Sequence, residues 1–224
     1  MTGMNRRGML VWSTVGLMAI LVALLMVYLC RSKPLAASRD SPLFAGTPFT
    51  ERGWQGIYPG VTSVEEASSI LERSPYVELP IYTSGTRYQG KSYKYIRWFN
   101  KTPCRFHDIP NEIIALDDTV VALQVCLDKD SQITVDDVVT GLGEPEKSAS
   151  HEAGGPEGAY ASTYLLYPEQ GFALETVNGL APTHLIVMVY YFEPTTPDEL
   201  RDSPISQLMY MDLANMEDWV GYVP

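Results

Sequence analysis

Residues 8–30 form a run of 23 positions without a charged side chain, and most of these positions are aliphatic. About 20 consecutive apolar residues are needed for a helix to cross the hydrocarbon core of a bilayer. The apolar part of a cleaved secretory signal is shorter, at about 7–15 residues. The run therefore predicts a single transmembrane helix at residues 8–30, preceded by a short head at residues 1–7.

Processing and orientation of this anchor leave alternatives open. Leu35-Ala36-Ala37 has the small residues of a signal cleavage site. Cys30 closes the apolar run as in lipoproteins, although Leu29 is larger than the residue that usually precedes a lipidated cysteine. Basic residues flank the run on both sides in nearly equal numbers, so the positive-inside rule does not decide the orientation of the helix. A short head before a long folded tail favours a signal anchor with the C-terminal domain outside the cytoplasm.

The charge of the chain limits its partners. Residues 1–33 hold four of the 16 basic residues and none of the 27 acidic ones. The remainder therefore has 12 basic and 27 acidic residues, for a net charge of −15. A field of that sign repels phosphate backbones, so we expect no nucleic-acid partner. The expected partners are the membrane, through residues 8–30, and a protein or another envelope component.

Helix start signals occur twice after the anchor. Residues 31–53 are rich in Pro, Ser, Thr and Gly, which is typical of a linker. Ser63 and Glu66 have the spacing of a helix capping box, and Thr134 and Asp137 repeat this pattern later in the chain. Apolar residues at helical spacing follow each start. Helices are therefore predicted at residues 63–73 and 134–142.

Strand patterns follow each predicted helix, three in each half. They cover residues 93–99, 112–116 and 119–127, and then residues 161–167, 171–177 and 184–192. The expected fold is α+β, with two tandem α-β-β-β units at residues 54–130 and 131–193 and antiparallel sheets. The C-terminal tail, residues 194–224, opens with a helix signal and is rich in apolar residues. We expect this tail to be partly helical and to pack back on the domain.

Two short motifs suggest a family. Gly60-Val-Thr62 precedes the first predicted helix, and Leu142-Gly-Glu-Pro145 ends the second. They resemble motifs of the small outer-membrane assembly lipoproteins of the BamE (SmpA/OmlA) type, in which a short helix precedes a three-stranded antiparallel sheet. A tandem pair of such units is similar to the beta-lactamase inhibitor protein. The resemblance covers roughly residues 56–193, and it implies a binding or scaffold protein rather than an enzyme.

The cysteines and histidines predict little chemistry. Cys104 and Cys126 are the two cysteines after the anchor, and a disulfide or two buried thiols are equal alternatives for them. A metal site built from these cysteines with His107 and His184 lacks the second closely spaced ligand pair of structural zinc sites. No nucleophile elbow or zinc-protease motif is present in the sequence. We therefore predict no metal, no cofactor and no catalytic residues.

The predicted function is a membrane-tethered, extracytoplasmic, non-enzymatic domain that binds a protein or an envelope component. An envelope hydrolase with a carboxylate and histidine site is one alternative, and an extracytoplasmic sensor domain is another. Strand alternation places large side chains on sheet faces that a single helix cannot cover. Tyr and Arg dominate interface hot spots, so the candidate binding residues are Tyr95, Arg97, Tyr164 and Tyr190. The alternative is that another sheet, or the tail with Trp219, covers this face.

Overall fold

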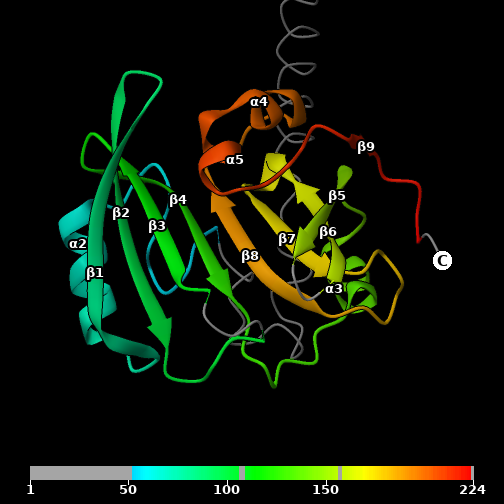
Figure 1. Ribbon diagram of the computed structural model, residues 1–224, viewed down its shortest axis with the longest axis horizontal. Coiled ribbons are helices and arrows are strands. Elements are labelled where there is room, and N and C mark those ends of the chain that lie inside the picture. Colours follow the sequence, from blue (N-terminus) through cyan, green and yellow to red (C-terminus); the bar gives the residue numbers. More distant parts are fainter. Residues whose placement is uncertain (1–51, 106–108, 156–157, 223–224) are drawn as a thin grey trace, which may run out of the picture. The chain divides into compact units, whose positions relative to one another are not determined.

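A computed structural model describes residues 52–105, 109–155 and 158–222 (Figure 1). The predicted head, the anchor at residues 8–30 and nearly all of the linker lie outside the described residues. Among the residues that are described, no helix is both long enough and apolar enough to span a bilayer.

The element order repeats once along the chain. Helix α2 (Val64–Arg73) is followed by strands β1 (Val77–Tyr88), β2 (Lys91–Asn100), β3 (Asn111–Leu116) and β4 (Thr119–Cys126). Helix α3 (Val135–Leu142) is followed by β5 (Lys147–Gly155), β6 (Gly158–Tyr167), the short helix η2 (Pro168–Gln170), β7 (Phe172–Val177) and β8 (Ile186–Phe192). The C-terminal segment adds α4 (Pro197–Asp202), α5 (Pro204–Leu208) and β9 (Met216–Asp218).

The strands of the described chain form one antiparallel sheet of nine strands, in the order β1-β2-β3-β4-β8-β7-β6-β5-β9. The two halves join where β4 pairs with β8, from Ala122 opposite Phe192 to Cys126 opposite Met188. The prediction of two α-β-β-β units is therefore wrong. Each helix is followed by four strands rather than three. The strands of both halves share a single sheet, because β4, the last strand of the first half, pairs with β8, the last strand of the second half.

β1 and β5 are the long strands that the sequence patterns missed. β1 contains Pro80 and Gly85 and is exposed along most of its length, so it shows no alternation of buried and exposed residues. β5 consists mainly of small and polar residues. β1 lies at one edge of the sheet, and β5 lies one strand from the other edge. In such positions a strand forms because it pairs with a neighbouring strand that is packed on a core. The β-propensity of its own residues contributes little.

The two helices begin with caps in equivalent places. The Ser63 hydroxyl accepts a hydrogen bond from the Glu66 backbone N–H at 3.1 Å. Thr134 and Asp137 cap each other reciprocally. The first N–H of each helix is bound by the turn that leads into the last strand of its half: Val64 donates to the carbonyl of Asp118, and Val135 donates to that of His184. These bonds fix each helix on the same face of the sheet.

Each face of the sheet carries its own core. α2 and α3 cover one face, whose largest fully buried side chains include Trp98, Tyr167 and Tyr191. The C-terminal segment covers the other face, where Leu200, Leu208, Met209, Met211 and Leu213 pack on the strands. Beyond β9 the chain reaches the helix side again, since Trp219 packs against the first core and the Tyr222 hydroxyl donates to Asp136 of α3 at 2.7 Å.

Candidate functional site

Three of the four predicted binding residues lie beneath the C-terminal segment. Tyr95, Tyr164 and Tyr190 are 8%, 3% and 4% exposed. The rings of Tyr164 and Tyr190 meet edge to face, with their centroids 5.9 Å apart. The structure therefore shows the alternative in which the tail covers this face, although the covering side chains are mainly Leu and Met. Trp219 packs on the opposite face.

A half-buried carboxylate lies among these tyrosines. Glu175 of β7 accepts hydrogen bonds from the Ser162 hydroxyl at 2.6 Å and from the Tyr190 hydroxyl at 2.5 Å. Burial raises the pKa of Glu175, and the two hydrogen bonds oppose that rise only in part. Burial likewise raises the pKa of Tyr190, and the Glu175 carboxylate adds to the effect. Each oxygen of Glu175 thus accepts a hydrogen bond from a hydroxyl group, an arrangement that stabilises the packing beneath the C-terminal segment.

Arg97, the fourth predicted residue, is half-buried at the margin of the covered face. Its guanidinium forms an ion pair with Glu112 on the neighbouring strand and lies 5.2 Å from the centre of the Tyr95 ring. Glu112 is 6% exposed, and its burial raises its pKa while Arg97 lowers it. Arg97 therefore neutralises a buried carboxylate. Its ring contact with Tyr95 is a cation–π interaction.

The cysteines and two of the histidines have identifiable partners. Cys104 and Cys126 form a disulfide with their Cα atoms 5.8 Å apart, which ties the segment after β2 to the end of β4. The ring of His184 hydrogen-bonds to the carbonyl of Gly179, and His151 contacts Asp212. His107 lies outside the described residues. Within the described ranges, no three His, Cys, Asp or Glu side chains come together as metal ligands would.

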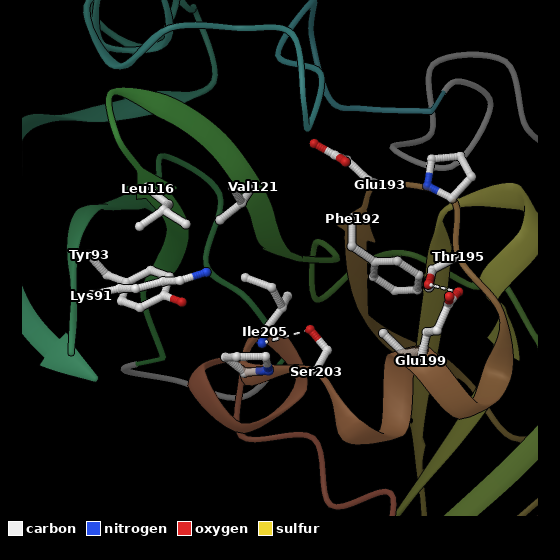
Figure 2. A pocket seen from close by; sticks show the side chains of 13 residues that line it. Lys91, Tyr93, Leu116, Val121, Phe192, Glu193, Thr195, Glu199, Ser203 and Ile205 are labelled. Atoms are coloured by element: carbon white, nitrogen blue, oxygen red, sulfur yellow. Dashed lines mark hydrogen bonds between the residues drawn. The ribbon is translucent and has the colours of Figure 1, made fainter. Parts of the chain in front are cut away.

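A pocket of about 320 Å³ lies between the β1–β2 hairpin and the C-terminal segment. Figure 2 shows the Lys91 side chain pointing into it, with Tyr93 beside it and Phe192 and Ile205 across from it. Burial raises the pKa of Tyr93 above its ordinary value, so its hydroxyl stays protonated and can donate. The pocket therefore offers an ammonium and a hydroxyl donor above apolar walls.

The carboxylates that line this pocket are directed elsewhere. The Glu193 carboxylate lies so close to Gly60 that a Cβ there would meet its Oε1 at 2.3 Å. Glu199 accepts hydrogen bonds from the backbone and hydroxyl of Thr196 and from the Thr195 hydroxyl. These bonds, the one from the Thr196 backbone first, lower the pKa of Glu199 and keep it ionised as a helix cap. The pocket thus has an ammonium and a hydroxyl group that can bind an acidic group, and one of its two carboxylates, Glu199, is held as a helix cap.

The basic residues of the chain concentrate on the β1–β2 hairpin. Residues 77–105 contain six of the 12 basic residues that follow residue 33, and only one acidic residue. Lys94 and Arg97 pair with Asp118 and Glu112, and Arg105 donates to two backbone carbonyls. The remaining three, Arg87, Lys91 and Lys101, form no ion pair with any other residue in the described ranges.

Exposed apolar side chains gather at the same hairpin and the segments that flank it. They are Tyr76, Leu79, Tyr82, Phe99 and Ile109, which are 62%, 57%, 55%, 39% and 40% exposed. Phe99 and Ile109 also line a shallow pocket of about 230 Å³ with Lys101. We call these five residues, together with Arg87, Lys91 and Lys101, the hairpin surface. Sequence reasoning missed it because the charge was summed over the whole chain, although the local excess of basic residues is visible in the sequence.

Comparisons of the chain with protein-family models, with curated proteins and with solved structures found no match.

Proposed function

We propose that this chain is a membrane-tethered, non-enzymatic domain that binds a protein partner through the hairpin surface. The observation that carries the proposal is the coincidence of exposed aromatic residues with unpaired basic residues on one hairpin of an otherwise acidic chain. Contiguous apolar groups on a soluble surface mark interaction sites, and charge of one sign selects a partner of the other sign. The proposed partner is therefore acidic at the surface that it presents.

The two carboxylates that lie deepest in the protein are bound by other side chains rather than arranged as a hydrolytic pair. A glycosidase needs two carboxyl groups facing one cleft. Glu112 and Glu175 lie on different strands, and each is already bound by an arginine or by hydroxyl groups. The pocket between the hairpin and the C-terminal segment is lined instead by Glu193 and Glu199, of which Glu199 is bound as a helix cap.

The hairpin surface is tested by two pairs of matched substitutions in the full chain, in native membranes. Tyr82→Ser and Arg87→Glu alter the hairpin surface. Tyr210→Ser removes a tyrosine that is 79% exposed on the C-terminal segment, and Arg73→Glu reverses an exposed arginine on α2. Cross-linking followed by mass spectrometry should identify a partner that the two hairpin variants lose and the two controls retain. Equal cross-linking in all four variants would contradict the proposed surface.

The tether is a separate part of the proposal and rests on the uncharged run at residues 8–30. We propose that this run stays in the mature protein and that the folded part faces away from the cytoplasm. Protease added to intact spheroplasts should then degrade the folded part, whereas a cytoplasmic marker stays intact. Protection of the folded part from protease, or its recovery as a soluble form, would contradict this arrangement.

A further inference from the structure

The outer side of β1 is an open edge of the sheet. β1 ends the strand order, so within the described ranges its outer backbone groups pair with no other strand. Natural proteins protect such edges with prolines, charges or bulges. On β1 these features occur at the beginning, where Pro80 lies in a register irregularity between Glu78 and Tyr82. From Tyr82 to Tyr88 the register with β2 is regular, and Arg87 is the single charged residue.

The turn of the hairpin determines which backbone groups face outward. Gln89 and Gly90 both have positive φ, 47° and 79°, as a two-residue type I′ turn requires. Tyr88 and Lys91 flank the turn and form a hydrogen-bonded pair across it. Pairs alternate along an antiparallel ladder between those that exchange hydrogen bonds and those that do not. The N–H and C=O groups of Thr83, Gly85 and Arg87 therefore point away from β2, toward the open edge.

The side chains near this edge leave room for another strand. Thr83, Gly85 and Arg87 share one face of β1, and the absence of a side chain at Gly85 keeps the middle of that face clear. A glycine within a strand often marks the close approach of another backbone. On the opposite face, Tyr82 is exposed in line with Arg97 of β2. An added strand would meet an aromatic ring and positive charge there.

We propose that an extended, acidic segment of a partner protein adds to the sheet as a strand beside β1. This inference rests on the function proposed above and specifies how the partner binds. Main-chain hydrogen bonds to Thr83, Gly85 and Arg87 supply affinity, and alternate side chains of the added strand supply specificity. Acidic side chains on that strand meet Arg87, which lacks an ion-pair partner among the described residues. The net charge of −11 repels acidic segments from the rest of the chain and so favours this edge.

The probe is a fluorescein-labelled peptide of eight residues that alternates Val and Glu, titrated into the full chain in detergent. We expect it to bind at least about tenfold more tightly than the same peptide with Lys in place of Glu. Methylation of alternate backbone nitrogens removes donors while it keeps every side chain. Two methylated peptides are compared, one with the odd-numbered and one with the even-numbered nitrogens methylated. Only one of them should bind at least about tenfold more weakly, because only the nitrogens that face β1 donate hydrogen bonds to it.

A matched pair of substitutions tests the same edge from the protein side. Thr83→Pro removes an outward N–H, and a proline is tolerated where the N–H of an edge strand faces solvent. Thr83→Val keeps that N–H and also suits a strand. We expect Thr83→Pro to weaken binding of the acidic peptide by at least about tenfold and Thr83→Val to leave it within about twofold. If Thr83→Pro does not fold, the methylated peptides still test whether a strand adds beside β1.

The possible outcomes separate strand addition from the broader proposal. Equal binding of the methylated and unmethylated peptides, or no binding of the acidic peptide, overturns strand addition. The hairpin surface would still stand if Tyr82→Ser and Arg87→Glu lose the cross-linked partner. Equally tight binding of a single-stranded oligonucleotide of the same charge would show that the hairpin binds any negatively charged chain. That result would also overturn the inference.

Discussion

The hydroxyl of Tyr190 on β8 donates a hydrogen bond to Glu175 Oε2 on the adjacent strand, at 2.5 Å, beneath the C-terminal segment. Burial raises the pKa of this carboxyl in the folded protein, so the folded state keeps its proton to a higher pH than the unfolded chain does. The resulting contribution to the free energy of unfolding is fully present below the pKa of the unfolded carboxyl. It is lost as the pH rises through the raised pKa of the folded state.

We therefore expect Glu175→Gln to remove part of the fall in stability with rising pH. Glutamine has nearly the same shape and cannot ionise, so its advantage over Glu175 should grow as the pH rises above the pKa of the unfolded carboxyl and through the raised pKa of the folded state. Urea unfolding at a series of pH values measures this difference. Glu72→Gln, at an exposed position on α2, is the control and should leave the pH dependence unchanged. A constant difference between Glu175→Gln and the unaltered protein across that range would contradict the prediction.

The two helix caps should differ in strength. The Thr134 hydroxyl contacts both the Asp137 backbone and its carboxylate, whereas the Ser63 hydroxyl accepts a single bond from Glu66 at an exposed position. Thr134→Ala should lower the free energy of unfolding by about 1–2 kcal/mol, and Ser63→Ala by about 0.5–1 kcal/mol. Chemical denaturation of both variants gives the comparison. A larger loss at Ser63 than at Thr134 would be inconsistent with these contacts.

The C-terminal segment should contribute strongly to stability, because its apolar side chains complete the second core. Leu200 on α4 is 1% exposed. Leu200→Ala should cost about 2–5 kcal/mol, as for other buried leucines. Val220→Ala, at a side chain that is 81% exposed, should cost less than about 0.5 kcal/mol. Similar small losses at both positions, measured by thermal or urea unfolding, would show that the segment is not part of the cooperative fold.

The disulfide should stabilise the fold by restricting the unfolded chain. Cys104 and Cys126 are 22 residues apart in the sequence, and a loop of that length corresponds to about 3 kcal/mol in the chain-entropy model. The double variant Cys104→Ser with Cys126→Ser should lose roughly this amount in urea unfolding. Reduction of the unaltered protein with dithiothreitol should produce a similar loss, while the double variant should not respond to it. A response of the double variant would point to another cause.

Local signals in the sequence predicted the local structure well. Ser63 and Thr134 mark helix starts because a cap depends on residues within one turn, and β2, β3, β4, β6, β7 and β8 all lie where alternating or apolar runs indicated strands. The pairing of β4 with β8 depends on contacts between residues distant in the sequence, which no local pattern encodes. The single sheet was therefore missed, and with it the exposed edge strand β1.

The candidate site was predicted less well, for a related reason. Strand alternation correctly placed Tyr95 and Arg97 on one face of β2. Whether that face is covered depends on where the C-terminal segment packs, and the sequence does not give its position. Exposure at Tyr82 and Phe99 likewise depends on the edge position of the hairpin. The excess of basic residues at positions 77–105 was the one signal for this surface that could be read in advance.

Because β4 pairs with β8, β4 must wait during protein synthesis until its partner strand has been made. The ribosome releases β4 about 60 residues before β8, so for several seconds the nascent first half has an unpaired strand edge where its final neighbour will lie. Another copy of the chain that emerges nearby during this interval offers its own β4 to that edge. A faster ribosome, or a holdase that covers the edge, should then raise the yield of correctly folded protein without altering any contact of the finished molecule.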